Sequence, residues 1–120
     1  MYKILLVDDA GFMRMMIKNY LTKAGYTDFV EGEDGAQAVQ LYEQEKPDLL
    51  IMDITMPNMD GIQALREIKK NHPDAKVVMC SAMGQESMVM EAITLGAMDF
   101  IVKPFKEERI VQTVNKVLPL

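Results

Sequence analysis

The sequence feature that most constrains the fold is a short apolar run that ends on one carboxylate. Residues 49–52 are all apolar, and Asp53 follows them directly. A continuous run of this length is typical of a strand that is buried on both faces, as in a parallel sheet. Pro57 and the Asp60-Gly61 pair then favour a turn. We therefore expect Asp53 at the carboxyl end of a central strand, with a loop-capping aspartate as the alternative.

Apolar runs and helical patterns alternate five times along the chain. Strands are expected at 3–7, 29–30, 49–53, 76–80 and 100–102, and helices at 12–24, around 38–42, around 62–68, at 85–95 and at 107–118. Such alternation requires parallel pairing through right-handed crossovers, with helices on both faces of the sheet. Five strands fit the α/β flavodoxin-like (βα)5 three-layer sandwich with strand order 2-1-3-4-5. We expect residues 1–120 to form one domain.

Composition and charge exclude several classes of function. A net charge of −5 without a basic stripe argues against nucleic-acid binding. No apolar run approaches the ~20 residues that span a bilayer, so no membrane association is expected. The first strand starts at once, which leaves no room for a signal peptide, and a cytoplasmic location is expected. Cys80 lies in an apolar run and is expected to be a packed, inert thiol.

Residues that can carry chemistry follow four of the five expected strands. Asp8 and Asp9 follow the first strand, Asp53 ends the third, Ser81 follows the fourth and Lys103 follows the fifth. In an open parallel sheet these ends meet at one edge, where ligands bind. Each residue alone has an ordinary explanation, because Asp and Ser cap helices and Lys is usually solvated. Their joint placement favours a functional site.

The three carboxylates predict a cation site. Ionised Asp8, Asp9 and Asp53 within a few ångströms repel one another, so they need raised pKa values or a bound cation. Mg²⁺ prefers a few carboxylates with water and phosphate oxygens, whereas the nitrogen and sulfur ligands typical of zinc are missing here. Asp53 could then attack a phosphoryl group, with Lys103 and Ser81 offsetting the charge on the phosphoryl oxygens.

In order and spacing, these residues resemble the receiver domain of two-component response regulators. The matching segments are Leu5-Leu6-Val7-Asp8-Asp9, Asp53-Ile54-Thr55-Met56-Pro57 with Asp60-Gly61, Cys80-Ser81-Ala82 and Val102-Lys103-Pro104-Phe105. The resemblance covers the whole chain and implies one receiver domain over residues 1–120. It implies that Asp53 accepts a phosphoryl group and that Asp9, Asp53 and the Thr55 backbone carbonyl bind Mg²⁺, with Asp8 acting through water.

The resemblance also implies a switch. Ser81 would be the switch hydroxyl and Lys103 the phosphoryl clamp, and the ring of Phe100 would move inward on activation. Many relatives have tyrosine at this position, and phenylalanine keeps the packing but offers no hydroxyl to a partner. Four methionines surround the fourth expected helix, and flexible thioethers are common on surfaces that accept partner helices, with core filling as the alternative. They are Met83, Met88, Met90 and Met98. The target face that the resemblance implies, made by the fourth and fifth helices and the fifth strand, favours a partly exposed docking surface.

The segment Ala10-Gly11-Phe12-Met13-Arg14-Met15-Met16 resembles stand-alone receivers of chemotaxis. Such a protein would be a monomer that takes phosphate from a CheA-like histidine kinase, binds the flagellar motor switch protein and is reset by a phosphatase. It would not be an enzyme beyond its own phosphorylation and dephosphorylation. The target face would be the fourth and fifth helices with the fifth strand.

Three other interpretations share part of this pattern. A receiver that passes phosphate along a sporulation-type relay would carry every one of the same site residues. A flavodoxin would share the fold, but Asp8 and Asp9 would repel the flavin phosphate from the first loop. A haloacid dehalogenase needs a second acid where Thr55 stands, and it also needs a cap domain.

Overall fold

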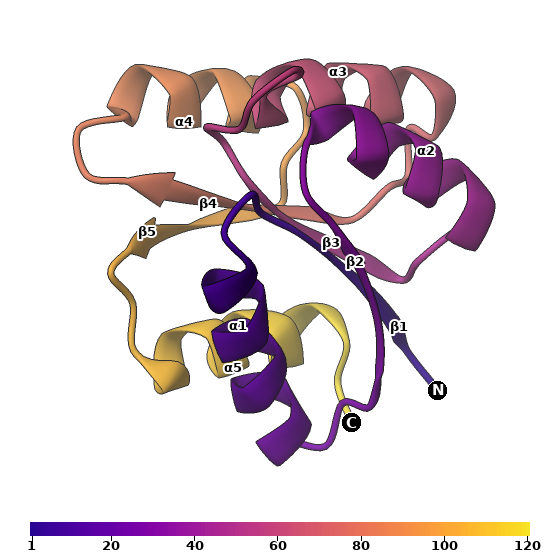
Figure 1. Ribbon diagram of the computed structural model, residues 1–120, viewed down its shortest axis with the longest axis vertical. Coiled ribbons are helices and arrows are strands. Elements are labelled where there is room, and N and C mark those ends of the chain that lie inside the picture. The colour runs from indigo at the N-terminus through magenta and orange to yellow at the C-terminus, as the bar shows by residue number, and fades with distance from the viewer.

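The computed structural model describes residues 1–120, in which five strands and five helices alternate (Figure 1). The elements are β1 (Lys3–Val7), α1 (Gly11–Lys23), β2 (Asp28–Gly32), α2 (Gly35–Glu45), β3 (Leu49–Asp53), α3 (Gly61–Asn71), β4 (Val77–Ala82), α4 (Glu86–Thr94), β5 (Asp99–Lys103) and α5 (Glu107–Val117). All strand pairs are parallel, and the order is β2-β1-β3-β4-β5. This confirms the predicted α/β fold and its strand order.

The sheet is the middle of three layers. Helices α1 and α5 cover one face, and α2, α3 and α4 cover the other (Figure 1). Strand β3 is buried over its whole length, with Leu50 and Met52 in the core beneath α2, α3 and α4, and Leu49 and Ile51 in the core beneath α1 and α5. A central strand that serves two cores has no solvent face, which explains its continuous apolar run.

Three strands are longer than the sequence predicts, and one of them is β5, which was expected at 100–102 and runs from Asp99 to Lys103. Strand β2 was expected only at 29–30, but it runs from Asp28 to Gly32 because all five residues pair with β1. It is an edge strand with a partly exposed face, so its apolar signal is short. Strand β4 was expected to end at Cys80, with Ser81 in a loop, but it continues to Ala82 through pairing with β5. Ser81 is therefore held within the sheet.

The loop after Asp53 is fixed by close packing and capping. A Cβ atom at Gly61 would lie 2.2 Å from the Asp53 carbonyl oxygen, so only glycine fits at the start of α3. Asp60 and Gln63 form a capping box, in which each side chain accepts a hydrogen bond from the backbone N–H of the other. The predicted turn after β3 is confirmed, and it anchors α3 directly against the end of the central strand.

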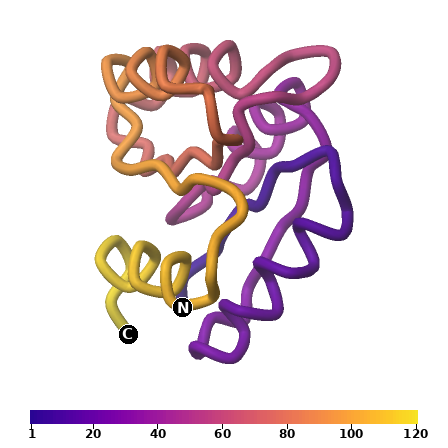
Figure 2. The backbone as a smooth tube through the Cα atoms, turned by 90° about the vertical axis from the view of Figure 1, so that its left-hand side faces the viewer, coloured from indigo at the N-terminus to yellow at the C-terminus, as the bar shows by residue number.

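The two ends of the chain lie on the same side of the molecule (Figure 2). The Tyr2 hydroxyl donates a hydrogen bond to the Pro119 carbonyl oxygen at 2.9 Å. The candidate site residues lie at the opposite ends of the strands, away from both termini. No helix has both the length and the apolar character needed to cross a membrane.

Candidate functional site

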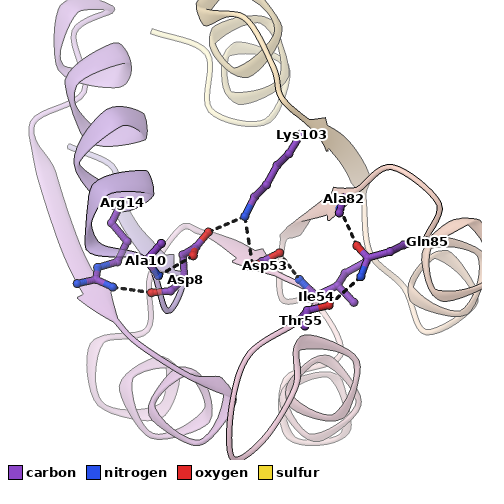
Figure 3. Close-up of polar contacts among 9 residues, drawn as sticks. All are labelled: Asp8, Ala10, Arg14, Asp53, Ile54, Thr55, Ala82, Gln85 and Lys103. Atoms are coloured by element: carbon purple, nitrogen blue, oxygen red, sulfur yellow. Dashed lines mark hydrogen bonds and ion pairs between the residues drawn. The ribbon is translucent and has the colours of Figure 1, made fainter.

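Three strand ends bring an ammonium group between two carboxylates (Figure 3). Lys103 Nζ lies 2.9 Å from Asp8 Oδ2 and 3.2 Å from Asp53 Oδ2. Asp8 and Asp53 are buried, with 3% and 8% of their surface exposed. The residues come from the ends of β1, β3 and β5, as expected for the carboxyl edge of a parallel sheet. A buried pair of acids is thus held around one cation.

Asp9 completes a cluster of three acids. One carboxylate oxygen from each of Asp8, Asp9 and Asp53 lies within 4.8 Å of the others, and Asp9 is exposed. Three carboxylates face one ammonium, so ionised acids outnumber the cation. Oxygen donors without nitrogen or sulfur are the ligand set of a hard cation. The residues present therefore fit Mg²⁺ at this edge.

Backbone contacts hold the two buried acids in fixed orientations. Asp53 Oδ1 accepts a hydrogen bond from the Ile54 N–H at 2.9 Å, which leaves Oδ2 toward Lys103. Asp8 Oδ1 accepts one from the Ala10 N–H at 2.9 Å. The Arg14 guanidinium donates to the Asp8 carbonyl oxygen and pairs with Glu31. Arg14 was not predicted as a site residue, because nothing in its helical pattern distinguishes it from a solvated arginine.

The electrostatics of the site make Asp53 more basic and keep Lys103 charged. Burial raises the pKa of Asp53, the positive charge of Lys103 opposes this rise, and the negative charge of Asp8 adds to it. Burial by itself lowers the pKa of Lys103, but its hydrogen bond to Asp8 and its attraction to Asp53 raise that pKa above the ordinary value. Lys103 is therefore a fixed cation beside a carboxylate whose negative charge is only partly compensated.

Ser81 lies at the end of β4 with its hydroxyl unused. It is 1% exposed, and its Oγ has no hydrogen-bond partner. The structure therefore does not join Ser81 to Asp53 or Lys103, although all three lie at one sheet edge. A buried hydroxyl without a partner costs free energy, so native proteins seldom keep one without a role.

The exposed side chain of Thr55 contacts Gln85, which the sequence did not predict as a site residue. Its Oγ1 accepts a hydrogen bond from Gln85 Nε2 at 2.7 Å, and Gln85 Oε1 accepts one from the Ala82 N–H at 2.6 Å. Gln85 directly precedes α4, in the short loop that follows β4. No local pattern in the sequence could indicate a contact with a residue 30 positions away.

A groove of about 420 Å³ lies beside the site, between α4 and β5. Ser81, Gln85, Met90 and Phe100 are among its lining residues. The Phe100 side chain is half-buried and packs against the core beneath α2, α3 and α4. The groove therefore begins at the strand end that carries Ser81 and continues along α4.

The four methionines around α4 divide into two kinds. Met83, Met90 and Met98 are exposed, whereas Met88 packs against the core. The expected partly exposed surface is thus made by three of the four. Cys80 is buried, which confirms the predicted packed cysteine, and burial raises the pKa of its thiol to about 12.

Comparisons with known proteins agree with this geometry. Residues 4–115 match the response regulator receiver domain. Chemotaxis protein CheY of Bacillus subtilis is 58% identical over 117 residues, which are 98% of both chains. Chemotaxis protein CheY of Thermotoga maritima is 56% identical over 115 residues, which are 96% of both. The CheX-CheY-BeF3-Mg complex from Borrelia burgdorferi contains a chain with a TM-score of 0.92 and 35% identity, covering 99% of this chain and 90% of that one.

The chain belongs to the response regulator receiver domain family.

Proposed function

We propose that residues 1–120 act as one receiver domain that accepts a phosphoryl group on Asp53 from a histidine kinase and controls the flagellar motor in chemotaxis. The observation that carries the proposal is the Lys103 ammonium, which lies within 3.2 Å of both Asp8 and Asp53. Membership of the receiver family supports phosphoryl acceptance, and it favours this function over the flavodoxin and haloacid dehalogenase interpretations. Similarity to chemotaxis proteins over almost the whole chain supports the motor role.

The proposed reaction transfers a phosphoryl group from a histidine nitrogen of the kinase to a carboxylate oxygen of Asp53. A carboxylate oxygen of Asp53 forms a bond to phosphorus as the phosphorus–nitrogen bond of the donor phosphohistidine breaks, and the leaving imidazole takes up a proton from solvent. Lys103 offsets negative charge on the phosphoryl oxygens, and the free Ser81 hydroxyl can donate to one of them. Catalysis by this chain then consists of positioning and charge neutralisation.

Asp8, Asp9 and Asp53, with the Thr55 backbone carbonyl, would hold Mg²⁺, and Asp8 would act through water. When bound, Mg²⁺ supplies positive charge that stabilises the phosphoryl oxygens. The excess of carboxylates over ammonium groups at this edge supports the assignment. Beyond its own phosphorylation and dephosphorylation we propose no enzymatic activity, and a separate phosphatase would reset the protein.

Intact-mass spectrometry tests the acceptor. Incubation with acetyl phosphate and Mg²⁺ should add one phosphoryl group to the wild-type protein, because Asp53 alone of the three acids is both buried beside Lys103 and placed at the end of the central strand. Asp53→Asn should add none, since the amide is not a nucleophile. Asp74→Asn, in the exposed loop that precedes β4 and outside the acidic cluster, is the matched control and should be labelled normally. Unchanged labelling of Asp53→Asn would overturn the assignment.

A further inference from the structure

Gln85 joins two segments at the mouth of the acidic site. Its carboxamide donates to Thr55 Oγ1 at 2.7 Å and accepts the Ala82 N–H at 2.6 Å (Figure 3). Thr55 lies two residues after Asp53, and Ala82 lies one residue after Ser81. Figure 3 shows Asp53 with Asp8 on one side and this bridge on the other. The bridge therefore connects the chain that follows the acceptor to the chain that follows the unused hydroxyl.

Helix capping does not account for the bridge. Gln85 occupies the N-cap position of α4, yet its side chain makes no capping hydrogen bond. Asp34 and Asp60, at the N-caps of α2 and α3, both accept a backbone N–H of their own helix. The second N–H of the Gln85 amide faces Met88 Sδ at 3.8 Å, so the carboxamide is fully used outside the cap. Departures from local preference of this kind are expected at functional positions.

The bridge occupies a donor that a phosphoryl group could use. The Ala82 N–H is adjacent to Ser81, whose Oγ has no partner, and both lie at the sheet edge that carries Asp53. A phosphoryl group on Asp53 would bring strong, negatively charged acceptor oxygens to this edge. Hydrogen bonds to such oxygens are about twice as strong as neutral ones, such as that between Ala82 and the Gln85 carboxamide.

We propose that Gln85 is a positioning residue that holds Thr55 and the Ala82 amide in the unphosphorylated arrangement and gives way when Asp53 is phosphorylated. This inference rests on the proposed phosphorylation of Asp53. The bonds made by Gln85 stabilise only the resting form, so they oppose activation. Because α4 begins one residue later, their release also frees the start of the helix that borders the groove.

Removing the bridge should favour the activated form. Gln85→Met keeps an unbranched side chain of similar length but loses both hydrogen bonds. Because a neutral hydrogen bond changes an equilibrium modestly, we expect Gln85→Met to bind beryllofluoride, a phosphoryl mimic, roughly 3- to 10-fold more tightly than the wild type. A residue that merely supported the fold would show the opposite sign, since its loss would weaken binding.

Isothermal titration of beryllofluoride at saturating Mg²⁺ measures this difference. Gln44→Met makes the same chemical change on the exposed side of α2 and should match the wild type. Thr55→Val removes one bridge bond from its other end, so it should tighten binding in the wild type and add little to Gln85→Met. In a ¹H–¹⁵N NMR spectrum recorded without beryllofluoride, the Ala82 amide of Gln85→Met should shift toward its position in the activated wild type.

The outcomes separate this inference from the function on which it rests. If wild-type protein did not bind beryllofluoride, the proposed phosphorylation of Asp53 would be overturned, and this inference with it. If the wild type bound while Gln85→Met bound equally well or more weakly, only the role of Gln85 would be overturned. Equal effects of Thr55→Val with and without Gln85 would also contradict a bridge between the two side chains.

Discussion

At the scale of single residues, the site sets one partly buried ammonium group against two buried carboxylates. Lys103 contacts both Asp8 and Asp53, and neither acid is more than 8% exposed. The pKa of Asp53 is still raised, with burial as the largest cause, so the cation does not fully compensate the loss of hydration. The ionised acceptor therefore destabilises the fold that holds it, as expected for a group kept for chemistry.

This balance predicts a pH-dependent effect of Asp53→Asn on stability. A carboxyl whose folded pKa is raised binds its proton more tightly in the native than in the unfolded state, so wild-type stability increases as pH falls through the folded pKa. Without Mg²⁺, Asp53→Asn should therefore melt at a higher temperature than the wild type at pH 7. This difference in melting temperature should shrink as the pH is lowered toward 3.8, the ordinary pKa of an aspartate carboxyl.

Differential scanning calorimetry at pH 7 and near pH 4, in the presence of a chelator, measures both points. Asp74→Asn carries the same change of charge on an exposed loop and should follow the wild type at each pH. A lower melting temperature for Asp53→Asn at pH 7 would mean that the pairing with Lys103 outweighs the cost of burial.

At the scale of elements, the sequence predicts what depends on local pattern and misses what depends on neighbours. Strands β1 and β3 were predicted to the residue, because both are central and their apolar runs coincide with burial on two faces. The end of β4 was misplaced, because Ser81 and Ala82 belong to the strand only through their pairing with β5. No periodicity in one segment can report that pairing.

The same distinction holds for the candidate site. The convergence of Asp8, Asp53 and Lys103 could be predicted, since topology alone brings strand ends to one edge. The contact of Gln85 with Thr55 could not, because it depends on how two loops approach each other in space. Arg14 was missed because its helical pattern is that of a solvated arginine, although its guanidinium donates a hydrogen bond to the Asp8 carbonyl oxygen.

Strand β4 and helix α4 connect the candidate site to the groove, so we expect phosphorylation of Asp53 to change the shape of the groove. Ser81 lines the groove that Phe100 also lines, so movement of the hydroxyl toward a phosphoryl oxygen would open space for the ring. We expect a flagellar motor-switch peptide to bind this groove roughly 5- to 150-fold more tightly when the protein is activated with beryllofluoride, the range that typical allosteric coupling gives. Ser81→Ala should reduce that ratio while leaving Asp53 able to accept phosphate.

Calorimetric titration of the peptide into resting, activated and Ser81→Ala protein measures the ratio. Thr22→Ala, on the exposed side of α1 and on the other face of the sheet, is a suitable control for loss of a hydroxyl. Equal affinity for resting and activated protein would remove the motor role. The phosphorelay interpretation, which shares every site residue, would then be preferred.

At the scale of the whole molecule, the residues that form the two hydrophobic cores are separate from the residues of the candidate site. The two cores lie on opposite faces of the sheet, and the acidic cluster lies outside both, at the carboxyl edge. Strand β5 is at one end of the sheet, so Lys103 can reach Asp53 across β4 while Phe100 stays near the surface. A change at the edge can therefore reach the groove without repacking the central strands.

The acidic cluster also links metal binding to the stability of the whole chain. A ligand that binds only the native state stabilises it by RT ln(1 + [L]/Kd), which is about 1.4 kcal/mol at ten times Kd. For a chain of 120 residues, this should raise the melting temperature by about 5 °C. Mg²⁺ should produce such a shift in the wild type, because it neutralises acids that otherwise repel one another in the native state.

Thermal melts over a Mg²⁺ titration, with and without a substitution at Asp9, test the ligand set. Asp9 is exposed and belongs to neither core, so Asp9→Ala should fold, and without metal it should melt at or slightly above the wild type because one of the repelling acids is gone. Its melting temperature should then rise only at much higher Mg²⁺ concentration, because one of three carboxylate ligands is lost. Asp74→Ala, which removes an exposed acid outside the cluster, should keep the wild-type response. The same Mg²⁺-dependent shift in Asp9→Ala and the wild type would show that Asp9 is not a ligand and that the cation is held elsewhere.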